Sequence, residues 1–194
     1  MAPSASNLLA GMGSLHLADF GAAEPADAAW ATPLDDEVWP DAGGTDDGLT
    51  LTVSRELFAL RMDQMVDAPG RRMSSREITL ATKLAEVTLE NMATAMGQSR
   101  DTVTSGGAAA TAYKSLDLIS DEEALGEPHY NAVCFRGRAP GGKPRLVFGR
   151  KVLSTEDVEQ SYKKDEQTFI PVTFVCHGVS ATVRPLRILD GVGV

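Results

Sequence analysis

The residues from Gly137 to Lys143, GRAPGGK, match the G-x-x-x-x-G-K pattern that begins a phosphate-binding loop. Such a loop needs a hydroxyl residue next, which holds magnesium, and a helix whose first backbone amides face the phosphate. The next residue is Pro144, which has no hydroxyl, and the RLVFG that follows is typical of a strand. A turn between two strands therefore explains these residues better, with a small hydrolase or nucleotide-binding domain as the alternative.

The histidines and cysteines show no spacing typical of metal ligands. His177 directly follows Cys176, so on a strand the two side chains point to opposite faces. A nucleophilic pair of Cys134 with His129, or of Cys176 with His16, stays open, but no G-x-S-x-G motif accompanies it. We expect both cysteines to be free thiols. We predict no catalytic, cofactor-binding or metal-binding residues and no cofactor, and we expect that the protein is not an enzyme.

Acidic residues are concentrated in the first quarter of the chain. Residues 1–50 contain no Lys or Arg and carry the whole formal net charge of −9. The acids are Asp19, Glu24, Asp27, Asp35, Asp36, Glu37, Asp41, Asp46 and Asp47. A protein that grips phosphates needs clustered Lys and Arg, so this pattern argues against a nucleic-acid binder. A solvated acidic segment that aids solubility is the plain interpretation, and a functional negative surface is the other.

One stretch, residues 74–97, shows two periodicities in succession. Its first part alternates as a half-buried strand does, with Ile78, Leu80, Thr82 and Leu84 on one side. Its second part predicts a helix over Thr88–Met96, and this is the one convincing helix of the chain. The helical stripe consists of Leu89, Met92, Ala93 and Met96. Thr88 suits the N-cap, and Gly97 suits the left-handed position after the helix.

The remaining segments predict strands. They lie at 14–20, 49–60, 111–120, 129–138, 144–152, 167–178 and 181–189. We expect residues 1–13 to form a flexible arm and residues 21–48 to form a long loop, which contains Trp30 and Trp39. Residues 98–110 are expected to be a flexible connection. Residues 153–164 could form a helical turn or an edge strand. We predict a mainly β (α+β) fold of two packed antiparallel sheets, a sandwich or barrel, with one flanking helix. It forms a single domain over 14–190, with 191–194 as a tail.

In this order the segments resemble the major tail tube proteins of long-tailed, non-contractile bacteriophages. The resemblance runs from about Ser14 to Asp190. It is carried by SLHLADF, an acidic loop with Pro and Trp, GTDDGLTLTVSRELFALRMDQ, SSREITLATKLAEVTLENMATAMG and GRKVLSTEDVEQSYKKDEQTFIPVTFVCHG. The long strand that runs into one helix is its most telling part. The motifs are degenerate, so the resemblance rests on order and pattern.

The resemblance implies that six copies form a ring and that rings stack into a tube. The tube assembles around a tape measure protein, meets tail terminator and tail tip proteins at its ends, and conducts DNA into the host without binding it specifically. The protein would be made in the bacterial cytoplasm and end in the virion tail, with no membrane partner; no apolar run approaches the ~20 residues of a membrane span. A tail terminator, or the tube protein of a contractile or secretion-type machine, is the alternative within this fold.

Two sets of residues follow from this resemblance. The projecting loop 61–73 would stack rings through Arg61, Asp63, Gln64, Arg71 and Arg72. A negative surface, facing the lumen in the resemblance, would include Asp35, Asp36, Glu37, Asp46 and Asp47. An acidic lumen repels DNA, which carries about one negative charge per 1.7 Å.

Overall fold

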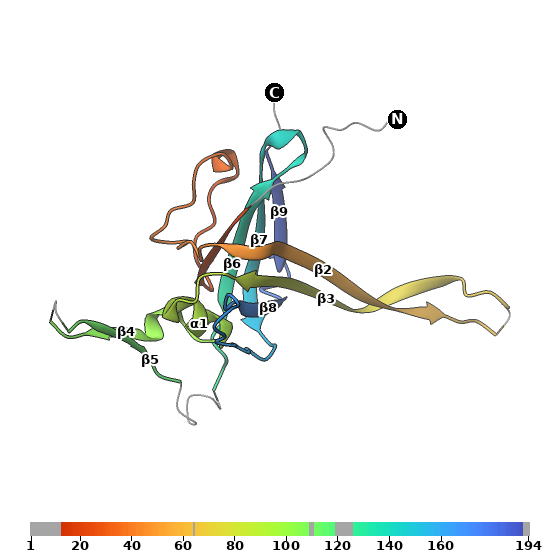
Figure 1. The fold of residues 1–194 in the computed structure, drawn as a ribbon. Helices are drawn as coiled ribbons and strands as arrows, with labels where there is room; N and C mark the ends of the chain where they lie inside the picture. The colour runs from red at the N-terminus through yellow and green to blue at the C-terminus, as the bar shows by residue number, and fades with distance from the viewer. Residues whose placement is uncertain (1–12, 64, 109–110, 119–125, 192–194) are drawn as a thin grey trace.

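A computed structural model of the chain describes residues 13–63, 65–108, 111–118 and 126–191 (Figure 1). These residues form a seven-stranded antiparallel sheet, a two-stranded sheet and one α-helix. The prediction of a mainly β fold with a flanking helix is confirmed. The predictions of a flexible arm over 1–13 and of a tail at 191–194 fall almost entirely outside the described residues.

The large sheet has the strand order β1-β6-β7-β8-β3-β2, and β9 pairs with β7. The strands are β1 (Ser14–Asp19), β2 (Thr45–Leu60), β3 (Gly70–Leu84), β6 (Asn131–Arg138), β7 (Pro144–Ser154), β8 (Ile170–Cys176) and β9 (Leu186–Asp190). The small sheet pairs β4 (Val103–Gly106) with β5 (Tyr113–Leu116). Single 3₁₀ turns, η2 to η4, lie at Asp27–Ala29, Arg100–Thr102 and Pro140–Gly142.

Strand β7 joins the two halves of the large sheet. Its residues 145–149 pair with both β6 and β9, whereas residues 152–154 pair with β8. The halves pack on each other like a sandwich, and β2 and β3 cross β6, β7 and β9 in Figure 1. The main core lies between them. It includes Leu15, Leu17, Leu80, Leu84, Val133, Val152, Ile170 and Phe174.

The predicted inward face of β3 is confirmed. Ile78, Leu80, Thr82 and Leu84 are all buried. The hydroxyl of Thr82 donates to the Gly48 carbonyl at 2.7 Å, so this polar side chain is satisfied in the core.

The long segment before β2 packs on the outer face of β1, β6 and β7. Trp39 is only 3% exposed, meets Phe148 edge to face, and donates from its indole nitrogen to the Ala23 carbonyl at 2.9 Å. One of the two tryptophans of the predicted loop therefore anchors it to its own domain. The loop ends earlier than predicted, because β2 begins at Thr45.

The helix α1 (Leu89–Ala95) begins and ends close to the predicted bounds. The Thr88 side chain accepts from the backbone N–H of Asn91, and Gly97 has a φ of +73°. The predicted apolar stripe is only partly right. The buried residues are Asn91, Ala93, Thr94 and Ala95, whereas Met96 is 39% exposed. A face of small residues lets the helix approach the sheet closely, and Asn91 bonds there to the Ala42 carbonyl.

Other strand predictions hold with shifted bounds. The hairpin of β6 and β7 is confirmed, as is the strand around Pro171. Pro171 pairs with Lys83 of β3 but with no residue of β7, so the lack of a backbone N–H at this proline is tolerated in the sheet. The predicted flexible connection over 98–110 is wrong where β4 forms. Residues 155–164 form neither a helix nor a strand.

Both cysteines are free, as expected. Burial raises the pKa of the Cys134 thiol to about 12 and that of Cys176 to about 11. Neither thiol is therefore ionised near neutral pH, which disfavours a nucleophilic role for either one.

Candidate assembly surfaces

The hairpin of β2 and β3 extends far beyond the body of the protein. We call residues 50–77 the arm (Figure 1). Nearly all of its described side chains are exposed, and its base continues the strands that form the core. An isolated two-stranded hairpin is at best marginally stable in water. The arm is therefore a structure that another surface would stabilise.

The two faces of the arm differ in character. Leu51 pairs with buried Leu80, and Val53 pairs with buried Ile78, so the core-facing side of the sheet continues onto the arm. A bulge at Ser74 shifts the register, after which Leu57 lies opposite Met73 on this same face. The opposite face of the arm base carries the threonines, serines and acids that pair along it.

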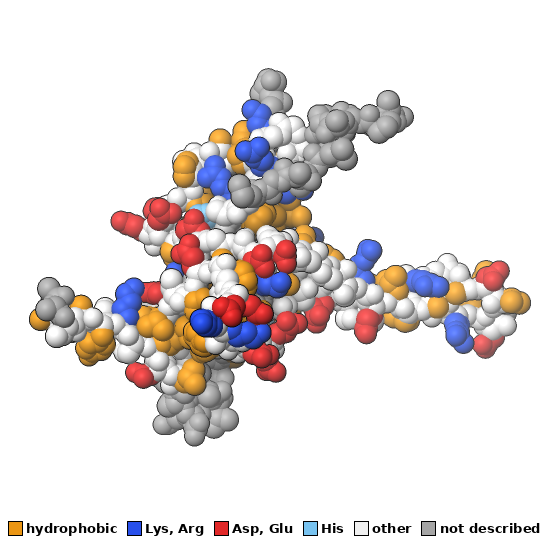
Figure 2. Space-filling view, viewed as in Figure 1, with side chains coloured by type: hydrophobic (Ala, Val, Ile, Leu, Met, Phe, Trp, Pro, Cys, Tyr) orange, Lys and Arg blue, Asp and Glu red, His pale blue; other side chains and the backbone are white. Residues whose placement is uncertain are grey.

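Large apolar side chains run along the arm without a cover. Figure 2 shows them between charged side chains towards the end of the arm. The exposed set is Leu51, Val53, Leu57, Phe58, Met62, Met65, Val66 and Met73. Leu57 and Met73 are 53% and 52% exposed. Large apolar side chains exposed in this number on one element are typical of an interaction site.

The edge strands β1 and β2, at the two ends of the strand order, are treated differently. The edge of β1 is covered by its own chain, because the Leu17 N–H bonds to the Pro40 carbonyl and the Ala42 N–H bonds to Leu15. The outer edge of β2, which is 16 residues long, makes no backbone hydrogen bonds to any described residue. A long uncovered edge strand is a template for pairing with another chain.

The predicted stacking residues separate into two groups. Arg61 and Asp63 lie exposed at the tip of the arm. Arg71 and Arg72 lie instead on β3, opposite Ala59 and Phe58, so the prediction of a loop is wrong from Gly70 onward. The ladder resumes beyond the bulge at Ser74 with its register shifted by one residue, and it continues to the pair of Leu60 and Gly70. Gln64 lies outside the described residues.

The five predicted acidic residues also separate. Asp46 and Asp47 sit at the start of β2, where Lys83 reaches them at 3.7 and 3.1 Å. The hydrogen bond from Lys83 to Asp47 and the negative charges of Asp47 and Asp46 raise the pKa of Lys83.

Asp35, Asp36 and Glu37 are exposed on the segment anchored by Trp39. They form no ion pair with any described residue, and a carboxylate oxygen of Asp35 accepts the Glu37 backbone N–H at 3.1 Å. The two acidic groups therefore belong to different surroundings: one is compensated by a lysine and the other is not.

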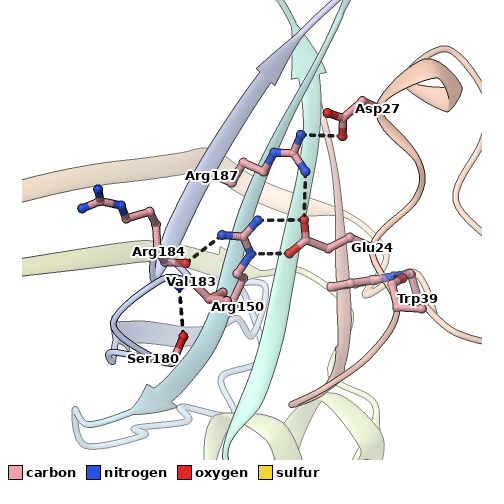
Figure 3. Close-up of polar contacts among 9 residues, drawn as sticks. Glu24, Asp27, Trp39, Arg150, Ser180, Val183, Arg184 and Arg187 are labelled. Atoms are coloured by element: carbon pink, nitrogen blue, oxygen red, sulfur yellow. Dashed lines mark hydrogen bonds and ion pairs between the residues drawn. The ribbon is translucent and has the colours of Figure 1, made fainter.

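A charged cluster that sequence reasoning missed ties the loop to the sheet. Glu24 accepts two hydrogen bonds from Arg150, one of them at 3.0 Å, and one from Arg187 at 3.3 Å (Figure 3). Arg187 also reaches Asp27 at 2.5 Å. The bonds from Arg150 hold the pKa of Glu24 below its usual value. The pairs join residues more than 100 positions apart, so no local pattern could have indicated them.

The segment that matches a phosphate-binding loop is a hairpin turn. The Ala139 N–H donates to the Lys143 carbonyl and the Gly142 N–H donates to Ala139, and Pro144 starts β7 directly. Among the described residues no helix follows Lys143, so this turn lacks the helix N-terminus that a phosphate-binding loop requires.

The sequence matches no protein-family model, and a search of curated proteins likewise finds no match. Among the described residues, no helix is long and apolar enough to cross a membrane. The same residues bring together no group of three or more His, Cys, Asp and Glu that could hold a metal ion.

Proposed function

We propose that this chain is a structural subunit that assembles with itself into a tube of stacked rings, as the tail tube proteins of long-tailed bacteriophages do. The observation that carries the proposal is the arm, with its uncovered β2 edge and its exposed apolar face. Six copies per ring is the number that the resemblance implies.

The arm supports assembly in two ways. Its uncovered edge offers backbone donors and acceptors along β2, which a strand of another copy can pair with. From residue 50 to residue 60 it spans about 33 Å at ~3.3 Å per residue, enough to reach a neighbouring subunit. Because the arm and the body that receives it are different surfaces, the contact is heterologous, and heterologous contacts close rings or build filaments.

The charge of the chain suits a conduit for DNA. Each copy carries a formal net charge of −9, and a ring multiplies this value. Repulsion between an acidic wall and the phosphate backbone extends over about 8 Å at physiological salt. The tube would assemble around a tape measure protein, be closed by terminator and tip proteins, and let DNA pass without specific binding. The virion tail is the proposed location.

Electron microscopy of the purified protein at rising concentration, with light scattering on the same samples, tests this proposal. We expect hollow rings or tubes with six-fold end views. A variant in which residues 62–68 are replaced by Asn-Gly should remain folded but should no longer stack rings, because it lacks the tip of the arm. If tubes fail to form even with the matching tape measure and tip proteins, the tail tube function is wrong.

The same images separate the related functions. Single rings that never stack would favour a tail terminator, and tubes that recruit a sheath would favour a contractile machine. The nucleotide-binding alternative predicts that Lys143→Ala abolishes nucleotide binding. We expect no binding in either protein and normal assembly of the variant, because Lys143 lies in a hairpin turn.

A further inference from the structure

A groove of about 460 Å³ lies where the arm joins the body. The β3 residues Ser74 and Arg76 line one side of it. The turn before β9 lines the other side with Ser180, Ala181 and Arg184, and the Ser180 hydroxyl accepts the Val183 backbone N–H at 3.0 Å. We call this the arginine groove.

Positive charge in the arginine groove is uncompensated. Arg76 lies directly opposite Arg55 in the ladder, and like charges in this arrangement repel. Neither of them, nor Arg184, forms an ion pair with a described residue. In Figure 3 the Arg184 guanidinium points away from the Glu24 cluster, to which Arg184 contributes only its carbonyl oxygen.

The other arginines of the body fall into two groups, because Arg100, Arg136 and Arg138 form no ion pair with a described residue and three others do. Arg145, Arg150 and Arg187 each bond to a carboxylate. The planar guanidinium fits a carboxylate through two parallel hydrogen bonds, so a cluster without carboxylates has unused capacity for such a ligand. The chemistry that fits the arginine groove is therefore a pair of closely spaced carboxylates.

The same chain displays such a ligand elsewhere. Asp35, Asp36 and Glu37 form an exposed acidic turn, whose shape is fixed because the Asp35 carbonyl accepts the backbone N–H groups of Val38 and Trp39. Buried Trp39 fixes it to the sheet. Five other acids of the first quarter, in contrast, already have a basic side chain as partner, which is His129 for Asp19 and a lysine or arginine for the other four. These are Asp19, Glu24, Asp27, Asp46 and Asp47.

We propose that the arginine groove of one copy binds the acidic turn, residues 35–37, of a second copy. This contact rests on the proposed self-assembly, and it would be the electrostatic part of the interface between copies. The segment before β2 lies on one side of the body and the arm extends from the other (Figure 1), so each copy can give its turn to one neighbour and take the turn of another. This assigns the three acids to a contact between copies and leaves Asp46 and Asp47 as the candidates for a lumen surface.

Charge reversal tests the contact. The first variant carries Arg76→Glu and Arg184→Glu, and the second carries Asp35→Lys, Asp36→Lys and Glu37→Lys. Alone, each variant opposes like charges in every contact, so the concentration needed for assembly should rise about tenfold or more. When the two variants are mixed in equal amounts, they can alternate around a ring. Each groove then faces an acidic-turn segment of opposite charge from the other variant. Assembly should return to within about threefold of the original protein.

The control variant carries Arg138→Glu and Lys164→Glu, an equal change of charge at exposed residues outside the groove. It should assemble as the original protein does. Circular dichroism and thermal unfolding first establish that all variants fold. If the mixture fails to associate although each variant folds, the inference is overturned.

Sedimentation velocity of the mixture separates this inference from the proposed function. Pairing of the two variants without rings or tubes would support the contact and contradict the tube. Tubes of the original protein, with no rescue in the mixture, would support the tube and contradict the contact.

Discussion

At the scale of single residues, long-range polar contacts hold the segments that local patterns could not place. Glu24 joins the first loop to β7 and β9, and Asn91 joins the helix to the segment before β2. Removing Asn91 would leave the Ala42 carbonyl without this bond, and removing Glu24 would leave Arg150 without a carboxylate, whereas Arg187 would keep Asp27. Removing one partner of a buried bond costs more than the bond contributes, because the other partner stays desolvated.

Glu24→Gln should lower the free energy of unfolding by about 1–3 kcal/mol at pH 7, since two arginines lose their shared carboxylate. The folded-state pKa of Glu24 lies below its usual 4.5. Its contribution is therefore present above that pH and is lost as the pH falls through the lowered pKa. Urea unfolding of both proteins from pH 7 to pH 3 should show the difference shrinking.

The matched control for Glu24 is Asp27→Asn. Asp27 meets Arg187 alone, and its side chain is 70% exposed. Its loss should change stability by less than about 0.5 kcal/mol. A difference between the original protein and Glu24→Gln that persists unchanged at pH 3 would contradict the assigned role of the carboxylate.

Asn91→Leu should destabilise the protein by about 1–3 kcal/mol, although leucine has a similar size. The Asn91 amide donates to the carbonyls of Ala42 and Glu86, at 2.8 and 2.9 Å, and accepts from Arg100. Chemical denaturation measures the loss, and Met96→Ala on the exposed side of the helix should cost less than about 1 kcal/mol. Equal stability of Asn91→Leu and the original protein would show that these bonds contribute nothing net.

At the scale of elements, the arm has two parts with different support. Its base adjoins the core, because Leu51 and Val53 of the arm pair with buried Leu80 and Ile78. Beyond the bulge at Ser74 the apolar face continues without any cover from the described residues. A hairpin in this position contributes little to the stability of a single copy, and its exposed face is available to another copy.

The double substitution Leu57→Ser with Met73→Ser should leave the melting temperature of the monomer within about 2 °C, because both side chains are half exposed. It should nevertheless raise the concentration needed for assembly about tenfold or more, since it removes a cross-strand apolar pair from the proposed interface. Light scattering against concentration measures this effect.

The control for the arm is Leu118→Ser, a matched change at a residue that is 72% exposed outside the arm. It should not alter assembly. Normal assembly of the Leu57 and Met73 variant would show that the apolar face of the arm is not an interface.

At the scale of the whole molecule, charge is distributed unevenly between surfaces. The acidic turn and the arginine groove are both uncompensated among the described residues, whereas Asp46 and Asp47 meet Lys83. Assembly would combine an electrostatic contact, which salt weakens, with an apolar contact, which salt does not weaken. The dependence of assembly on salt therefore reports both.

Raising the salt from 0.05 to 0.5 M should weaken assembly several-fold without abolishing it, because the Debye length falls to a few ångströms. A variant with Arg76→Gln and Arg184→Gln should lose most of this dependence. Sedimentation at several salt concentrations provides the measurement. Identical salt dependence in the two proteins would place the electrostatic contact elsewhere.

In the proposed tube, the acidic surface would also affect the passage of DNA. Replacing Asp46 and Asp47 by Asn should change the rate of DNA ejection and its salt dependence, because less negative charge then faces the phosphates. Ejection from assembled particles measures the rate. If both quantities stay the same, these residues do not face the lumen.

Much of the fold follows from patterns within short segments. Alternation predicted β3 and the hairpin of β6 and β7, and local polar chemistry predicted the cap at Thr88 and the turn at Gly97. These features depend on the side-chain period and on neighbouring backbone groups, which a sequence displays directly. The helix face was mistaken at Met96 and Asn91 because a buried amide, when fully bonded, can replace an apolar residue.

The candidate surfaces depended on tertiary structure. Sequence alone determined where negative charge is concentrated, that a hairpin would project near residues 61–73, and that the Gly137–Lys143 segment suits a turn. Only the folded chain decided that β2 is an uncovered edge, that Arg55 faces Arg76, and that Asp46 and Asp47 are paired while the acidic turn is not. These properties arise from strand order and register between distant segments, and no period within one segment encodes which neighbour it will meet.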